Sequence, residues 1–189
     1  MSYTNIDLCS RALVELGANS ISSFDETSCE ATVASQLYQP TLENLLASYP
    51  WRFALKQKSL PRLENKPISD YQYAFQLPNN CLRILSAGQS VKSSGLQYKI
   101  VGKCLYANTS EVILNYIEKP DESTFPPFFI KAFITQLASE FCLPLTESTT
   151  RTDYMRKIAA EELKQARLVD SQQSINPCFQ DFSLIEVRA

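Results

Sequence analysis

The chain has 189 residues, of which 18 are Lys or Arg, 20 are Asp or Glu and none is His, so its formal net charge is −2. Hydrophobic residues make up 44% and charged residues 20%, which is typical of a folded globular protein and argues against wholesale disorder. The absence of His excludes a Ser-His or Cys-His relay and a His-bearing zinc site, and four scattered Gly are too few for a phosphate-binding loop.

A first helix is predicted over residues 4–17. Thr4 can cap it, and Asp7 places a carboxylate near the positive end of the helix dipole. Apolar residues recur at spacings of three and four up to Leu16, and Gly17 then supplies the left-handed residue that commonly ends a helix. The N-terminus shows neither the basic start nor the apolar run of a signal peptide, so we expect a cytosolic product.

A second helix is predicted over residues 28–48. Ser28 or Asp25 can cap it, and apolar residues continue along one face to the end of the segment. Pro40 is expected to kink or restart this helix, because proline lacks the backbone N–H that the helix interior uses. Pro50 ends the helical run.

The hydrophobic period changes from 3.6 to 2 at residue 51. Trp51, Phe53 and Leu55 alternate with polar or small residues, which predicts a half-buried strand at this point. Strands are therefore expected between residues 51 and 117. The further candidates are residues 81–87, 96–101, 104–107 and 112–117.

Two connections between these strands can be interpreted from composition. Gly102-Lys103 separates two strand candidates and predicts a tight two-residue hairpin turn. Residues 61–78 contain three prolines among polar residues, which predicts an irregular excursion on the surface.

Helices are predicted again in the C-terminal part, over residues 126–142 and 152–170. The first of these has only a narrow polar strip, so it is expected to be buried on most sides, by its own domain or by a neighbouring subunit, and to end before Pro144. The second is amphipathic, with surface pairs expected between Asp153 and Lys157 and between Glu161 and Lys164.

Residues 171–189 form a C-terminal tail without a clear hydrophobic period. The tail carries isolated large apolar residues, among them Phe179, Phe182, Leu184 and Ile185. A segment of this kind is either loosely ordered or awaits a partner, so we interpret it as a docking tail.

These elements predict an α+β fold that is mainly helical, in which N- and C-terminal helices pack with a small antiparallel β-sheet. Residues 1–170 are expected to form a single domain. The six cysteines are scattered without a C-x-x-C pair, so they are interpreted as reduced and mostly buried.

The N-terminal pattern resembles a known family. The segments that carry the resemblance are Leu13-Val14-Glu15-Leu16-Gly17, Ile21-Ser22-Ser23-Phe24-Asp25-Glu26, Glu30-Ala31, Tyr38, Leu45-Leu46 and Tyr49-Pro50-Trp51-Arg52-Phe53-Ala54. They resemble the tail tubular protein A family, which comprises head-to-tail adaptor (connector) proteins of short-tailed phages and related prophages. Leu77-Pro78 before a strand, a strand through Tyr116 and two closing helices also fit that family, so the resemblance spans nearly the whole chain.

The resemblance implies a structural virion protein at the head-tail junction, made in the cytoplasm of the bacterial host. Its expected partners are eleven further copies in a twelve-subunit ring, the portal protein, the tail nozzle protein and the double-stranded DNA that passes through the lumen. The isolated subunit can be monomeric. Neither enzymatic activity, nor a cofactor or metal, nor a membrane is expected.

Three sets of residues are candidates for this role. The family-motif core comprises Leu16, Gly17, Pro50, Trp51 and Phe53, with Trp51 expected to be a core anchor first and an interface residue second. The candidate interface comprises Phe129, Phe133, Leu137, Phe179, Phe182 and Leu184. The candidate basic patch comprises Arg52, Lys56, Lys58 and Arg62. We interpret it first as a strand face exposed to solvent. A contact with DNA, or ion pairs with Asp25 or Glu26 of a neighbouring subunit, are the alternatives.

Two other functions remain open. The acidic clusters Asp25, Glu26, Glu30 and Asp153, Glu161, Glu162 could serve a carboxylate-dependent cell-wall hydrolase of a phage tail, which needs two carboxylates facing a sugar. Acidic residues near helix starts are also what the helix dipole favours, so the structural interpretation is preferred. The other alternative is a prophage-encoded scaffold protein that does not assemble.

Overall fold

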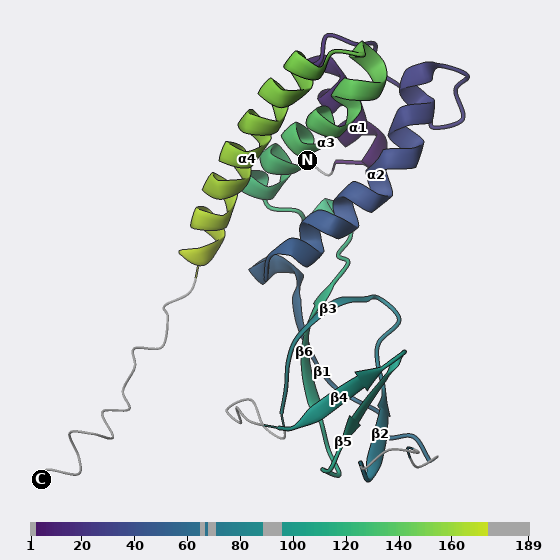
Figure 1. Cartoon of the computed structure of the whole chain (residues 1–189), viewed down its shortest axis with the longest axis vertical. Helices are drawn as coiled ribbons and strands as arrows, with labels where there is room; N and C mark the ends of the chain where they lie inside the picture. The colour runs from purple at the N-terminus through teal and green to yellow at the C-terminus, as the bar shows by residue number, and fades with distance from the viewer. Residues whose placement is uncertain (1–2, 65–66, 68–70, 89–95, 174–189) are drawn as a thin grey trace, which may run out of the picture.

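The computed structural model describes residues 3–64, 67, 71–88 and 96–173 of the chain. They form an elongated molecule with helices at one end and strands at the other (Figure 1). The helices are α1 (Asn5–Glu15), α2 (Cys29–Ser48), α3 (Pro127–Thr146) and α4 (Thr149–Ser171). The strands are β1 (Leu55–Ser59), β2 (Tyr73–Gln76), β3 (Cys81–Gly88), β4 (Tyr98–Val101), β5 (Cys104–Ala107) and β6 (Ile113–Glu118). The predicted α+β class is confirmed.

The first predicted helix is confirmed together with its caps. The Thr4 hydroxyl accepts a hydrogen bond from the Asp7 amide at 3.2 Å, and the Asp7 carboxylate accepts one from the Thr4 amide at 2.9 Å, which completes a capping box. These bonds hold the pKa of Asp7 below its usual range. Gly17 follows the helix with φ of +69°, a conformation that side chains disfavour.

The prediction that Pro40 interrupts the second helix is wrong, since α2 runs unbroken from Cys29 to Ser48. Pro40 removes only one backbone hydrogen bond, the one to the carbonyl of Gln36. Both residues are exposed, so water can reach that carbonyl. Leu42, Leu45 and the other buried residues of α2 stabilise the helix from its opposite side.

Proline also fails to end α3, which continues through Pro144 to Thr146. The helix ends at Glu147, which adopts a left-handed conformation with φ of 51° and donates its amide to the Leu143 carbonyl at 3.0 Å. The boundary predicted at residue 142 is therefore one turn too early.

The last helix begins before the predicted residue 152, because Ser148 caps it by accepting from the Arg151 amide. Along its surface, Asp153 pairs with Arg156 at 4.0 Å and not with Lys157 as predicted. The predicted pair of Glu161 and Lys164 is present at 4.0 Å.

The strand predicted to begin at Trp51 begins at Leu55. Residues Arg52–Ala54 form a 3-10 turn instead, and Leu55, predicted to face inward, is 39% exposed. The cause is tertiary packing: the rings of Trp51 and Phe53 lie 5.1 and 4.8 Å from that of Phe129 on α3, which draws both side chains into the helical core.

The strands form two antiparallel sheets of three strands each, in the orders β1-β6-β3 and β2-β5-β4, where one small sheet was predicted. The predicted Gly102-Lys103 turn is confirmed, since it joins β4 to β5 with Gly102 at φ of +59°. The prediction of an irregular excursion over residues 61–78 is wrong in part. It contains β2, in which the fully buried Phe75 pairs with Leu105.

Each end of the molecule has its own hydrophobic core. The helical half, which we define as α1–α4 with residues 49–54, buries Leu13, Leu46, Trp51 and Phe133 among others. The sheet half, which we define as β1–β6, buries Phe75, Leu105, Leu114 and Tyr116 between its sheets. Strand β6 connects the two, because its Ile117 packs in the helical core.

The five cysteines within the described residues are reduced, as predicted. Cys9 and Cys142 are buried, and burial raises the pKa of the Cys9 thiol to about 12. Cys81 and Cys104 are half-buried and Cys29 is exposed, so the prediction that the cysteines are mostly buried is wrong for the described residues. Cys178 lies outside the described residues.

Candidate interaction surfaces

The interface predicted on α3 has no exposed side chain in this subunit. Phe129, Phe133 and Leu137 are each 0% exposed, because α1, α2 and α4 all pack against α3. The apolar character of this helix therefore reflects the subunit's own core. The other three predicted interface residues, Phe179, Phe182 and Leu184, lie outside the described residues.

Residues 49–54, which we call the joint, connect the two halves. Trp51 is fully buried, as predicted, and its indole donates to the Leu45 carbonyl at 3.0 Å. The carboxylate of Asp170 on α4 accepts from the Arg52 amide at 3.2 and 3.3 Å. The joint is thus bound on one side to α2 and on the other to the end of α4.

The bond from Asp170 is unusual for its position. A carboxylate in the last turn of a helix faces the negative end of the dipole, and Asp170 is also 0% exposed. Burial raises the pKa of this carboxyl, although the hydrogen bond from Arg52 acts in the opposite direction. The sequence analysis did not predict this contact. The only signal for it in the sequence is an acidic residue near the C-terminal end of a helix.

The other members of the family-motif core have different surroundings. Leu16 is buried, Phe53 is half-buried, and Gly17 and Pro50 are exposed. The first two contribute to the helical core, whereas the glycine and the proline act through backbone conformation at a helix end.

The four predicted basic residues do not share one environment. Lys56 and Lys58 are exposed on the same side of β1, opposite Tyr116 and Leu114. The guanidinium of Arg62 lies 4.2 Å from the centre of the Tyr73 ring, a cation–π contact within the sheet half. Arg52 is exposed, and its backbone is bound by α4.

Charge is distributed unevenly along the molecule. Residues 51–125 carry ten Lys and Arg against six Asp and Glu, whereas residues 1–50 carry one Arg against six Asp and Glu. The strands and their connections are thus basic, and the first two helices are acidic.

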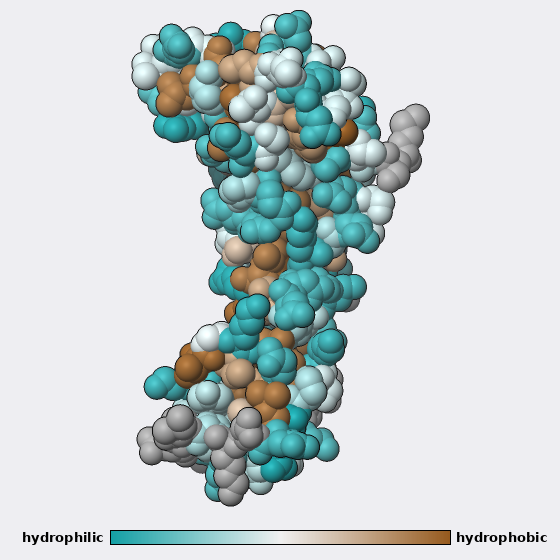
Figure 2. Space-filling view, turned by 90° about the vertical axis from the view of Figure 1, so that its right-hand side faces the viewer, coloured by the Kyte–Doolittle hydropathy of each residue, from teal (hydrophilic) through white to brown (hydrophobic). Residues whose placement is uncertain are grey.

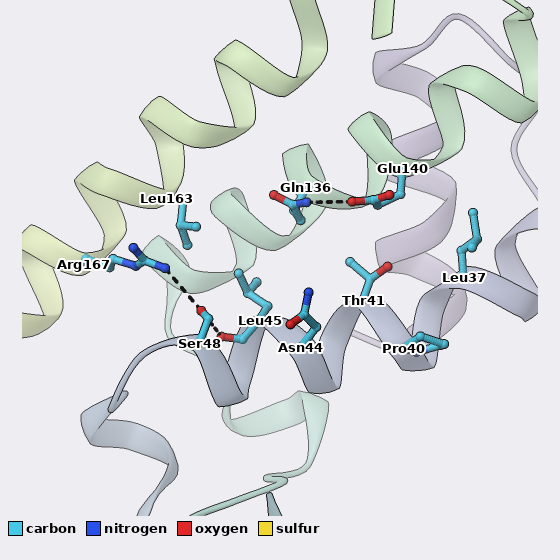
Figure 3. A pocket seen from close by; sticks show the side chains of 10 residues that line it. All are labelled: Leu37, Pro40, Thr41, Asn44, Leu45, Ser48, Gln136, Glu140, Leu163 and Arg167. Carbon is cyan, nitrogen blue, oxygen red and sulfur yellow. Dashed lines mark hydrogen bonds between the residues drawn. The ribbon is translucent and has the colours of Figure 1, made fainter. Parts of the chain in front are cut away.

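A groove lies between α2 and α4, with α3 as its floor, and it encloses about 340 Å³ (Figure 3). Its apolar lining includes Leu37, Leu45 and Leu163. The guanidinium of Arg167 donates to the Ser48 hydroxyl at 3.2 Å at one end, and Glu140 accepts from Gln136 at 3.0 Å toward the other. The sequence analysis did not predict this groove, since its walls come from helices far apart in the chain.

A second hollow of about 330 Å³ lies in the sheet half between β3 and the β4–β5 hairpin. Strand β4 is an edge strand beside it, with Ile100 and Val101 45% and 44% exposed. Hydrophobic side chains reach the surface in this half and also between the two halves (Figure 2).

Several residues of the acidic clusters have structural partners. Glu26 accepts hydrogen bonds from the Ser22 and Ser23 amides, and these bonds hold its pKa below the usual range. Glu30 accepts from the Asn19 amide group at 3.4 Å. The groove of α2, α3 and α4 contains one carboxylate, Glu140, and the hollow beside β4 contains none. Neither provides the carboxylate pair that a glycosidase requires.

Among the described residues, no group of three or more Cys, Asp or Glu side chains could hold a metal ion. One helix of that part of the chain, α3, is long and apolar enough to cross a membrane by length and composition alone. The burial of its side chains by three other helices accounts for its composition.

No model of a known protein family matches the chain, and no curated protein sequence matches it either. Function is therefore inferred from the residues and their arrangement.

Proposed function

We propose that this protein is a structural subunit of a phage head-to-tail connector ring, which joins the portal to the tail and retains packaged DNA. The observation that carries the proposal is the resemblance of residues 13–54 to the tail tubular protein A family. Residues 49–54, which close the motif, form the joint between the two halves, and the buried Trp51 anchors it. The closing segment of the motif thus coincides with the joint that connects the two halves.

The shape and charge of the subunit also support this role. A closed ring of identical subunits needs two different, complementary surfaces on each copy. The molecule is elongated, with acidic first helices and a basic sheet half, so it presents chemically different surfaces at its two ends (Figure 1). A subunit of this form can contact one component of the virion with its helices and another with its strands.

A structural role also agrees with the use of the acidic residues. Glu26 caps a turn and Asp153 pairs along a helix surface, so these groups stabilise the fold. We expect no hydrolase or transferase activity. Peptidoglycan cleavage that is abolished by Glu30→Gln or Asp25→Asn would favour the cell-wall hydrolase instead.

Electron microscopy of the protein mixed with portal protein from the same phage genome tests the proposal. We expect a twelve-subunit ring of additional density below the portal. Portal alone, and portal with an unrelated protein of similar size, are the controls. A homogeneous preparation that adds no density to the portal would favour a prophage scaffold protein that does not assemble.

Deletion of residues 172–189 tests whether the C-terminal tail is needed for this assembly. The described residues of both hydrophobic cores lie before residue 172, so we expect a folded, soluble subunit that no longer joins the portal. Loss of folding would mean that the tail belongs to the core. Unchanged portal binding would mean that docking occurs elsewhere, with the helices as the next candidates.

A further inference from the structure

The groove between α2 and α4 lies beside the point where the described C-terminal part of the chain ends. Helix α4, which forms one wall, ends at Ser171, four residues after Arg167. Residues 174–189 then follow Gln173. The segment therefore starts within about 10 Å of the groove's Arg167 end, given the rise of 1.5 Å per helical residue.

Arg167, which lines the groove, has a polar atom that lacks a partner in the described part of the chain. The Nε of Arg167 is buried and has no hydrogen-bond acceptor among the described residues, although its Nη2 donates to Ser48. The Tyr49 ring lies 5.5 Å from the guanidinium and covers it without accepting from Nε. A buried N–H without an acceptor is destabilising, so an additional acceptor that reaches the Arg167 guanidinium would stabilise the subunit.

Residues 174–189 match the groove in composition. They contain Ile175, Phe179, Phe182, Leu184 and Ile185, which lose free energy when left in water. The groove offers Leu37, Leu45 and Leu163 as apolar contacts.

The charge of the segment matches one end of the groove. Counted from Gln173, the first charged residue of the segment is Asp181, and Glu186 and Arg188 follow it. Counted from the end of α4, the first charged residue of the groove is Arg167 (Figure 3). The first carboxylate of a chain that folds back along the groove can thus pair with Arg167.

The segment is also long enough to span the groove. The α2 wall extends about 16 Å from Leu37 to Ser48. The six residue-to-residue steps from Gln173 to Phe179 span up to about 20 Å when extended, and the remaining residues can cover the rest of the groove.

We infer that residues 174–189 occupy the groove between α2 and α4 of their own subunit, where they cover its apolar lining and provide the acceptor for Arg167. Attachment to α4 gives the segment an effective concentration in the millimolar range, which favours its own groove over that of a second copy. The inference concerns the isolated subunit and does not depend on the connector role. In a connector, the same segment would leave the groove when it docks to the portal.

Disulfide trapping in the full-length chain tests this occupancy. Cys178 lies within the segment, and Asn44 is an exposed residue of α2 that lines the groove. In a Cys29→Ser background, which removes the exposed native thiol, Asn44→Cys is expected to form an intrachain disulfide with Cys178 under mild oxidation. Ser35→Cys is the matched control, because Ser35 is exposed on the opposite side of the same helix.

We expect the disulfide of the Asn44→Cys variant to form at least about tenfold faster than that of the Ser35→Cys variant. Peptide mapping of the monomeric product identifies the linked residues. Equal rates for the two variants would overturn the inference. A disulfide found only between chains would overturn occupancy by the same subunit and indicate exchange between copies.

A second measurement uses the reactivity of one thiol. In a Cys29→Ser, Cys178→Ser background, the thiol of Asn44→Cys is expected to react with an alkylating reagent several-fold more slowly than when Phe179→Ser and Phe182→Ser are also present. The same two tail substitutions should leave the reactivity of Ser35→Cys unchanged. Equal protection of the Asn44→Cys thiol with and without the phenylalanines would contradict the inference.

Discussion

The two halves of this chain bury their residues to very different extents. In the helical half, ten of the 20 residues of α3 are buried, because the other three helices surround it. In the sheet half, all five residues of β1 are exposed, and β4 exposes three of its four. Both are edge strands, with backbone groups that a further strand could pair with.

This difference suggests a division of labour between the halves. The helical half has the larger core and binds the joint through Trp51 and Asp170, so it determines how the sheet half is held. The sheet half has a small core, open edges and an excess of cations, so more of its surface is available to partners. The helical half would then provide rigidity, and the sheet half would provide contact surface.

Truncating the anchor of the joint should have the largest effect. Trp51 is fully buried, contacts the rings of Tyr49, Phe53 and Phe129, and donates to the Leu45 carbonyl. We expect Trp51→Ala to lower the free energy of unfolding by about 3 to 5 kcal/mol. Chemical denaturation followed by circular dichroism measures this change. Tyr154→Ala is the control, since Tyr154 is 63% exposed on α4, and equal midpoints for the two variants would contradict the prediction.

Shortening a core side chain in the sheet half tests whether the two halves unfold separately. Phe75 is 0% exposed in the second core, and we expect Phe75→Ala to destabilise the sheet half by about 3 kcal/mol. Hydrogen exchange should then accelerate in β2, β4 and β5 while α1 to α3 remain protected. Equal loss of protection in the helices would show that the two cores form one cooperative unit.

The sequence predicted the helices well, because their starts depend on local chemistry. Thr4 caps α1 as expected, and Ser28, one of the two candidates with Asp25, caps α2. The errors at Pro40 and Pro144 share one cause, since a proline removes a single backbone bond that packing elsewhere on the helix can offset. Strand β2 has four residues between prolines, too few for a period to be recognised.

The surfaces were harder to predict, because they depend on which elements meet. The apolar face of Phe129 and Phe133 fits a core and an interface equally well in sequence, and only the packing of three helices around α3 distinguishes them. The groove likewise needs Leu37 and Arg167, which lie on α2 and α4. Trp51 was correctly predicted to be buried, but its neighbours were assigned to a strand because alternation alone cannot reveal contact with Phe129.

The pH dependence of stability tests how the contact between Asp170 and the joint contributes to folding. Burial raises the pKa of Asp170 in the folded protein, so its ionised form opposes folding relative to the neutral form. The stabilisation from the neutral form is complete below the unfolded pKa and is lost as pH rises through the higher folded pKa. Asp170→Asn keeps a side-chain acceptor for the Arg52 amide and removes the charge from the end of α4.

We therefore expect Asp170→Asn to stabilise the protein at pH 7, by about 1 kcal/mol or less from the helix dipole alone. The gain over the parent should shrink as pH falls toward 4, and thermal unfolding at several pH values measures it. Asp153→Asn is the control on the exposed start of the same helix, where no such gain is expected. A loss of stability at pH 7 would mean that the charged hydrogen bond to Arg52 outweighs desolvation.

The smallest effect on stability is expected from the exposed cations of β1. Lys56 and Lys58 lie on an edge strand with no ion pair among the described residues, so Lys56→Glu with Lys58→Glu should change the free energy of unfolding by about 0.5 kcal/mol or less. If both side chains contacted DNA phosphates, the slope of log affinity against log salt would fall by about 2. We expect no such fall, because a solvated strand face accounts for these residues. Duplex binding at several salt concentrations measures the slope, with Lys157→Glu on α4 as a single charge-reversal control. A slope that falls only for the β1 variant would instead assign DNA contact to the sheet half. The two halves would then differ in DNA binding as well as in the burial of their residues.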